Sequence, residues 1–228
     1  MILAQVIKRV FRFKNGDISG SCVVIDVDNR QYICTAKHCF PSSGDFIEIF
    51  HDNQWKPSKV RLVGYGSHDS DISVLASDIQ LVPNNLPLSA NCGELSYGQE
   101  VFFLGFPYGM HMDSMELNNQ YPFPFVKRFT LSAFSTSKNG KNEFFLDGHN
   151  NPGFSGGPVV FSPRGHQKGE WRIFAIVSGY RHQNVPVLNK DGKETGDIVH
   201  ANTGITHAYG INHAVDVIHS NPIGLPLK

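Results

Sequence analysis

The chain has 228 residues, of which 18% are charged and 40% hydrophobic, and its formal charges cancel. This length fits either one large all-β unit or two small domains, and either can bury a core without disulfides. The neutral balance disfavours a polyanion partner, so we expect no nucleic-acid ligand. No apolar stretch approaches the roughly 20 residues that cross a bilayer, so we expect no membrane partner.

The N-terminal segment, residues 1–14, places its charged residues after a short apolar run, and no small-residue cleavage site follows. An export signal has its positive charges before the apolar run. We therefore expect a cytoplasmic protein.

Short runs of β-branched and aromatic residues, bounded by Gly, Asn, Asp or Pro, recur along the chain. Such runs are typical of strands, and no long stretch of helical period separates them. The pattern predicts an all-β barrel or sandwich instead of alternating βα units. The expected strands are residues 22–27, 31–36, 45–50, 58–65, 72–77, 100–106, 127–134, 142–147, 157–161 and 172–180.

Three segments depart from this strand pattern. Residues 78–98 carry two prolines and several Asn and Gly residues, so we place a domain boundary near residue 90, between domains 1–90 and 91–228. Residues 108–124 form a long non-periodic insertion, either a functional loop or a tolerated excursion. Residues 211–220 place apolar side chains at helical spacing, which predicts a short C-terminal helix.

The cysteines and histidines do not form a recognisable metal motif. The four cysteines, Cys22, Cys34, Cys39 and Cys92, include no C-x-x-C pair, and no histidine belongs to an H-E-x-x-H motif. We therefore expect buried free thiols, no metal site and no cofactor.

The stretch HNNPGFSGGPVVF, residues 149–161, packs two prolines, three glycines and one serine into a short segment. A serine hydroxyl is a weak nucleophile unless a base lies within hydrogen-bond reach. A glycine-rich bend can aim the N–H groups of Gly153 and Ser155 at one point, where they would stabilise an oxyanion. Clusters of glycine and proline also close ordinary hairpins, so a purely structural turn is the alternative.

Two further polar residues stand at the edges of predicted strands. His38 follows the strand-like residues 31–36, and Asp71 directly precedes the apolar run 72–77. Each residue alone is typical of a capped histidine or of a turn aspartate. Together with Ser155 they are candidates for the base and the orienting carboxylate that an activated serine nucleophile needs.

At these positions the sequence resembles the trypsin-like (chymotrypsin-fold) serine proteases, especially the compact bacterial branch that includes the HtrA-type proteases. Residues 35–39, TAKHC, are similar to the family's T-A-A-H-C, and residues 71–75, DISVL, to its D-I-A-L-L. Residues 151–158, NPGFSGGP, are similar to the N-P-G-N-S-G-G-P of the HtrA branch. The resemblance extends from about residue 18 to residue 220 and includes no PDZ domain.

This resemblance implies two six-stranded antiparallel Greek-key β-barrels and a short C-terminal helix. It also implies a serine endopeptidase that acts on a polypeptide substrate: Ser155 attacks the peptide carbonyl, His38 takes its proton, and Asp71 orients the imidazole. The N–H groups of Gly153 and Ser155 would form the oxyanion hole.

The resemblance also assigns residues that bind the substrate. Ser178 matches a serine that supports the triad aspartate, while Gly179 and Tyr180 lie on the strand that pairs with an extended substrate. His149 matches the floor of the pocket for the side chain before the scissile bond. Since His149 carries no fixed negative charge and Tyr180 would narrow this pocket, we expect a small apolar side chain there first and an acidic one second.

Several positions depart from the family pattern or leave alternatives open. Phe154 replaces the aspartate that zymogen-activated members use, and no IVGG-like start is present, so we do not expect activation by N-terminal cleavage. Whether the oxyanion hole is preformed or needs ordering by a ligand remains open. Cys22 and Cys39 lie near the positions of a disulfide common in secreted members, and we expect them to stay reduced. Asp69 competes with Asp71, which we prefer because it directly precedes the strand.

A different class of function is a catalytically silent domain of this fold that binds a peptide or protein partner, with residues 108–124 as its contact loop. We favour the enzyme, because His38, Asp71 and Ser155 are all present.

Overall fold

The computed structural model describes residues 4–41, 44–67, 70–112, 115–136, 142–163 and 170–227. Apart from three short 3₁₀ helices, its elements in chain order are α1 (Ala4–Ile7), β1 (Val10–Asn15), β2 (Ile18–Val27), β3 (Arg30–Thr35), β4 (Phe46–His51), β5 (Gln54–Tyr65), β6 (Ser73–Ser77), β7 (Ser89–Ala90), β8 (Glu100–Gly105), β9 (Phe125–Thr136), β10 (Asn142–Asp147), β11 (Pro158–Phe161), β12 (Arg172–Leu188), β13 (Glu194–Gly210), α2 (Asn212–Ser220) and β14 (Leu225–Pro226). The 3₁₀ helices are η1 (Lys37–Cys39), η2 (Pro107–Gly109) and η3 (Met115–Asn118).

The first six strands close into a ring. Their hydrogen-bonded order is β3, β2, β1, β4, β5, β6, and β6 pairs back with β3. The second ring has the order β8, β9, β10, β13, β12, β11, and β11 pairs back with β8. In each ring a fourth strand lies beside the first of three consecutive strands, which is the Greek-key arrangement. The predicted pair of six-stranded antiparallel barrels is therefore confirmed.

Alternation along the strands divides the apolar side chains among three cores. One fills the first barrel and includes Cys22 and Val24 of β2, while another fills the second barrel. The third includes Val23 of β2 together with Ile173 and Ile176 of β12. Because this third core contains residues of both barrels, it fixes how they pack against each other.

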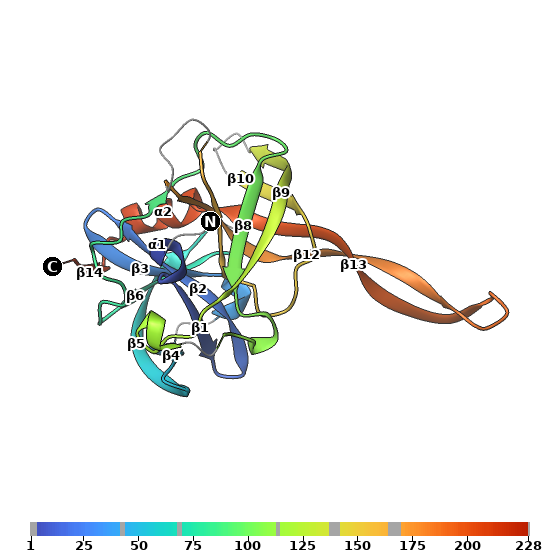
Figure 1. Ribbon diagram of the computed structural model, residues 1–228, viewed down its shortest axis with the longest axis horizontal. Coiled ribbons are helices and arrows are strands. Elements are labelled where there is room, and N and C mark those ends of the chain that lie inside the picture. The colour runs from blue at the N-terminus through green and yellow to red at the C-terminus, as the bar shows by residue number, and fades with distance from the viewer. Residues whose placement is uncertain are drawn as a thin grey trace.

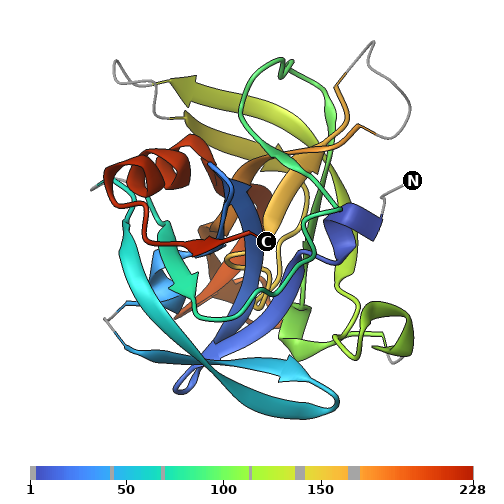
Figure 2. The same ribbon diagram turned by 90° about the vertical axis from the view of Figure 1, so that its left-hand side faces the viewer.

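The predicted C-terminal helix is present as α2 and covers the first barrel although it follows the last strand of the second. It packs against β5 and β6 (Figure 2, red). Ile211, Ala214 and Ile218 are buried in the core shared by the two barrels. Within the described part of the chain, no helix is long and apolar enough to span a membrane.

Two short strands join the barrel to which their place in the sequence would not assign them. The short strand β7 pairs in parallel with β12 of the second barrel. At the other end of the chain, β14 pairs with β3 of the first barrel. Each barrel therefore carries one short strand contributed from outside its main sequence range.

The longest strands form a two-stranded arm that leaves the second barrel. Strands β12 and β13 each contain 17 residues, and their outer halves project far from the rest of the molecule (Figure 1). The pairing continues from Ala175↔Gly210 in the barrel to Leu188↔Glu194 near the tip. The sequence prediction ended the first of these strands at residue 180 and missed the arm, because the arm has no buried face to impose an apolar alternation.

Strands β1, β7 and β14 were also missed. Strand β1 places Phe11 and Phe13 inside the first barrel. The predicted insertion, residues 108–124, contains parts of η2 and η3 and an isolated bridge between Met112 and Phe123. Where it is described, it packs against the first barrel: the Gln120 carbonyl accepts from the Asp52 N–H at 2.9 Å, and Tyr121 contacts the ring of Phe11.

Candidate active site

His38 and Asp71 meet because the strands beside them pair. His38 lies in η1 directly after β3, Asp71 directly precedes β6, and the register pairs Thr35 with Ser73. The His38 Nδ1 atom lies 2.6 Å from Asp71 Oδ2, and the His38 backbone N–H donates to Asp71 Oδ1 at 2.9 Å. The carboxylate thus fixes both the position of the residue and the orientation of its ring.

Ser178 of β12 brings the second barrel to this pair. Its hydroxyl donates to Asp71 Oδ2 at 2.6 Å. Burial by itself would raise the pKa of Asp71, but the hydrogen bonds from His38 and Ser178 outweigh it and hold the pKa below its ordinary value. Asp71 is therefore a carboxylate at neutral pH.

The same contacts favour the protonated form of His38. The hydrogen bond to Asp71 is the main cause that raises the pKa of His38 to about 10, a neighbouring Cys39 raises it further, and partial burial acts in the opposite direction. The ring is half exposed, with 51% of the side chain accessible. It is thus open to proton exchange with a bound molecule.

Ser155 lies in a tight turn between β10 and β11 that only glycines allow. Gly153 has φ 102° and Gly156 has φ 84°, both in the region that favours glycine. A Cβ atom on Gly156 would collide with the Ser21 carbonyl of β2. The turn is therefore pressed against the first barrel, near the strand ends that carry His38 and Asp71.

The Ser155 hydroxyl does not bond to the imidazole in this structure. It donates to the Ser178 carbonyl at 2.9 Å, and no hydrogen bond to His38 is present between these two described residues. His38, Asp71 and Ser178 form one hydrogen-bonded chain, and Ser155 joins it through the Ser178 backbone. The sequence interpretation required the imidazole to accept a hydrogen bond from the hydroxyl, and the hydroxyl instead donates to the Ser178 carbonyl here.

Hydrogen bonds to two of its carbonyls hold the backbone of the turn in place. The Pro152 carbonyl accepts from Tyr108 N–H at 2.7 Å, and the Gly153 carbonyl accepts from the Ser21 hydroxyl at 2.7 Å. Since C=O and N–H point in opposite directions across a trans peptide, the Gly153 N–H points away from Tyr108. Neither this N–H nor that of Ser155 has a hydrogen-bond partner among the described residues.

Lys127 of β9 contacts the turn from the second barrel. Its ammonium group donates to the His149 carbonyl and, at 3.0 Å, to Asn151 Oδ1. It also lies 5.7 Å from the ring centroid of the fully buried Phe154. Phe154 thus anchors the turn in the core of the second barrel. It stands at the position where zymogen-activated members of the family that the sequence resembles have an aspartate.

The remaining predicted residues border the turn on the side of the second barrel. His149 is exposed, and a Cβ atom on Gly204 of β13 would lie 3.8 Å from its Nδ1 atom. Gly179 is half-buried, and Tyr180 is exposed at the base of the arm. The structure therefore places His149, Gly179 and Tyr180 on elements that adjoin Ser155.

All four cysteines are free. Burial raises the pKa values of Cys22 and Cys34 far above the ordinary thiol value. The Sγ atom of Cys39 faces Gly20, where a Cβ atom would lie 3.1 Å away. Cys22 lies in the same core as Cys39 and near enough that Cys39 also raises its pKa, and both thiols are free.

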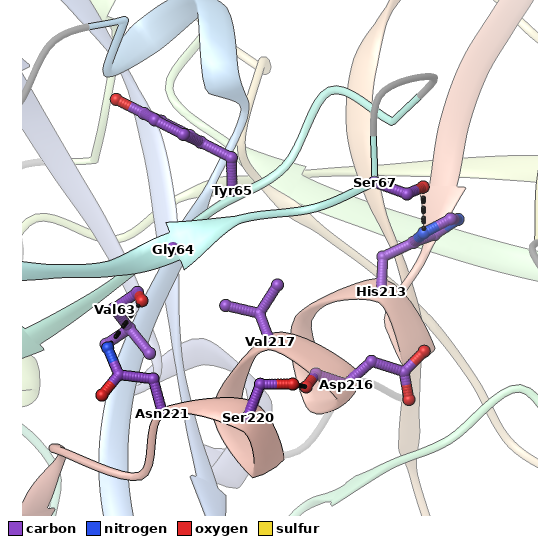
Figure 3. A pocket seen from close by; sticks show the side chains of 9 residues that line it. All are labelled: Val63, Gly64, Tyr65, Ser67, His213, Asp216, Val217, Ser220 and Asn221. Atoms are coloured by element: carbon purple, nitrogen blue, oxygen red, sulfur yellow. Dashed lines mark hydrogen bonds between the residues drawn. The ribbon is translucent and has the colours of Figure 1, made fainter.

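A pocket of about 330 Å³ lies between β5 and α2 and is lined by Ser67, His213 and Asp216, among others (Figure 3). None of His38, Asp71 and Ser155 lines it. The described residues contain no group of three or more His, Cys, Asp or Glu residues placed to hold a metal ion.

Three residues that hold the site were not found from the sequence: Ser21, Tyr108 and Lys127. Each acts through a contact with a residue distant in the chain, and only the FPYG turn around Tyr108, where φ is 52°, gave a local signal. Asp69, the competitor of Asp71, lies outside the described residues.

Comparisons with known proteins agree with this geometry. The sequence profile of the trypsin-like peptidase domain matches residues 20–169, a range that contains His38, Asp71 and Ser155. No curated protein sequence is significantly similar to the chain.

Solved structures share the fold. The HtrA-type protease AlgW with tripeptide has 20% identity and a TM-score of 0.59, over 95% of this chain and 61% of that chain. The Rv3671c protease from M. tuberculosis, active form, has 16% identity and a TM-score of 0.58, over 99% and 86%. Deg5 has 16% identity and a TM-score of 0.57, over 93% and 88%. This chain thus spans less than two thirds of the AlgW chain, and at these identities the likeness establishes the fold alone.

Proposed function

Because the chain belongs to the trypsin-like peptidase family, we propose that it is a serine endopeptidase that hydrolyses peptide bonds through an acyl-enzyme intermediate. The observation that carries this proposal is the Asp71 carboxylate, which receives hydrogen bonds from His38 of one barrel and Ser178 of the other. A carboxylate on Nδ1 leaves Nε2 of the imidazole free to accept a proton.

In the proposed reaction Ser155 Oγ attacks the substrate carbonyl carbon and His38 Nε2 takes the hydroxyl proton. His38 then gives this proton to the leaving amine, and a water molecule, deprotonated by the same imidazole, releases the acyl group. The Ser155 hydroxyl must first leave the Ser178 carbonyl, which requires a rotation about χ1 between staggered positions. Catalytic hydrogen bonds are often completed only when substrate binds.

The N–H groups of Gly153 and Ser155 would stabilise the oxyanion that forms in the attack. Support comes from the Pro152 and Gly153 carbonyls, which are held by Tyr108 and Ser21. These contacts keep the turn in a shape that leaves both N–H groups without an internal acceptor. We therefore propose that the oxyanion hole is preformed.

A polypeptide substrate would pair with residues 178–180. Strand β11 pairs with β12 only as far as Ile176, and no described strand continues along that edge beside Gly179 and Tyr180. An open strand edge accepts an extended peptide through main-chain hydrogen bonds. His149 would border the side chain before the scissile bond, for which we propose a small apolar residue first and an acidic one second.

The proposal is tested by treating the purified protein with a fluorophosphonate probe and locating the adduct by mass spectrometry. We expect a single adduct on Ser155, because only an activated serine reacts with the probe. Since the pKa of His38 is raised to about 10, the rate of labelling should increase as the pH of the reaction rises through the alkaline range. Absence of labelling in the folded protein would contradict the peptidase and favour the silent binding domain, in which the Ser155 hydroxyl stays on the Ser178 carbonyl.

The pH dependence of activity should follow His38. The base must be neutral, and the contact with Asp71 raises its pKa to about 10, so we expect kcat/KM to rise with pH through the alkaline range instead of levelling near 6.5. By the same linkage, the His38–Asp71 contact stabilises the fold below the unfolded pKa of histidine and loses this effect as pH rises through about 10. Initial rates on a fluorogenic peptide between pH 5 and 10.5 measure the profile, and a flat profile above pH 7 would contradict the raised pKa.

A further inference from the structure

Arg12 of β1 lies beside the turn that carries the nucleophile. Its cross-strand partner is Ser21 of β2, and directly opposed residues of an antiparallel pair project from the same face. Ser21 in turn donates its hydroxyl to the Gly153 carbonyl and its N–H to the Ser155 carbonyl at 2.9 Å. Arg12 therefore lies on the same face of the sheet as Ser21, the residue that holds the turn of Ser155.

The guanidinium of Arg12 is enclosed by aromatic rings. Its Cζ atom lies 4.8 Å from the ring centroid of Phe50 and 4.9 Å from that of Trp55. On another side it contacts Gly109, where any Cβ atom would collide with it. The two ring faces favour a cation, and the glycine leaves room for the planar group.

The charge is nevertheless left without an anion. Its Nε atom is buried and has no hydrogen-bond partner, and no ion pair or hydrogen bond to the Arg12 guanidinium is present within the described ranges. Arg9, three residues earlier, shows the contrast: it is fully buried and bonds to Asp26 at 2.5 Å and to two main-chain carbonyls, those of Val24 and Leu86. Burial lowers the pKa of Arg12, which agrees with a cation that lacks compensation.

The neighbouring cation does not compete for an incoming anion. Lys14 also lies over Trp55, at 5.0 Å from the ring centroid, but it is paired with Glu48 at 3.0 Å. Arg12 is thus the uncompensated charge of this aromatic cluster. A planar guanidinium binds a carboxylate through two parallel hydrogen bonds, which a lysine cannot reproduce.

We propose that Arg12 forms a substrate subsite that binds an acidic side chain located after the scissile bond. The inference rests on the proposed peptidase function for the direction of the substrate. Residues before the scissile bond would follow Gly179 and Tyr180, on the side of Ser178, to which the Ser155 hydroxyl bonds. Arg12 is reached from Ser155 through Ser21 of β2 and not through β12, so we assign it to the path of the leaving segment.

The subsite is tested with peptides that differ by one charge. Digestion of a mixed peptide library, read by mass spectrometry, first provides a cleaved sequence. Quenched fluorescent peptides of this sequence then carry either Glu or Gln at each of the first three positions after the scissile bond. We expect the wild type to prefer Glu at one position by roughly ten- to a hundredfold in kcat/KM, the range of a hydrogen bond to a charged group, and Arg12→Gln to reduce this ratio to about one.

Two variants serve as controls. Arg12→Lys keeps the charge without the planar fork and should retain only part of the preference. Arg128→Gln removes an exposed arginine of β9 that pairs with Glu100 and should leave the Glu/Gln ratio unchanged. Cleavage of the Gln peptides and fluorophosphonate labelling should stay close to wild type in all three variants, which separates loss of the subsite from loss of the fold.

A Glu/Gln ratio near one at every position in the wild type would overturn the subsite while leaving the peptidase intact. A ratio that persists in Arg12→Gln would also overturn it. If no peptide is cleaved and Ser155 is not labelled, the proposed function fails. Fluorescence anisotropy then decides the inference: the wild type and Arg12→Gln are titrated with two labelled peptide pools of otherwise identical random composition, one containing Glu and the other Gln. Glu-specific binding that needs Arg12 supports the inference, and equal binding contradicts it.

Discussion

Ser155→Ala should lower kcat on a peptide substrate by about 10⁶, because the triad acts as a unit and the remaining groups cannot form an acyl-enzyme. The substitution removes only the hydroxyl that now bonds to the Ser178 carbonyl. The turn itself is held by Gly153, Gly156 and the buried Phe154, so the melting temperature should change little. Initial rates and a thermal melt measure the two effects.

Ser132→Ala is the matched control, since Ser132 is an exposed serine of β9. It should retain wild-type activity and labelling. If the Ser155→Ala variant keeps its peptidase activity after it has been purified again, another residue is the nucleophile.

Asp71→Asn should lower kcat by about 10⁴. The amide can no longer stabilise an imidazolium, and it favours the wrong histidine tautomer because its NH₂ group donates where the carboxylate accepts. Loss of the carboxylate also removes the main cause of the raised His38 pKa. The residual activity should therefore reach its plateau at lower pH than in the wild type, which a rate profile over the same pH range would reveal.

Asp69→Asn tests the competing assignment. The neighbouring aspartate of the same HDSDIS segment should tolerate the change with an activity near that of the wild type. A severe loss in Asp69→Asn together with a harmless Asp71→Asn would reverse the roles of the two residues.

Local sequence carried the information for most strands and for the residues proposed to react. Alternating apolar runs mark where strands are half-buried, and the glycines of residues 151–158 mark a turn that requires positive φ at Gly153 and Gly156. The ordered motifs around His38, Asp71 and Ser155 then carried the resemblance from which the two-barrel fold followed, and the barrels are confirmed.

Long-range contacts determined the rest. In the arm, β12 and β13 pair only with each other among the described strands, and both faces are exposed to solvent. No alternation of apolar residues therefore marks the arm in the sequence. The support of the turn by Ser21 and Lys127 depends on which strands pack against it.

The sequence by itself thus determined the strand pattern, the glycine turn and the identity of the three residues proposed for the triad, because these depend on side-chain period and backbone conformation within a few residues. Only the tertiary structure decided that the Ser155 hydroxyl turns to the Ser178 carbonyl, that Gly20 faces Cys39, and that Arg12 stands without an anion near the nucleophile. Each of these depends on the register between strands that are distant in the chain, and register is set by the packing of both barrels together.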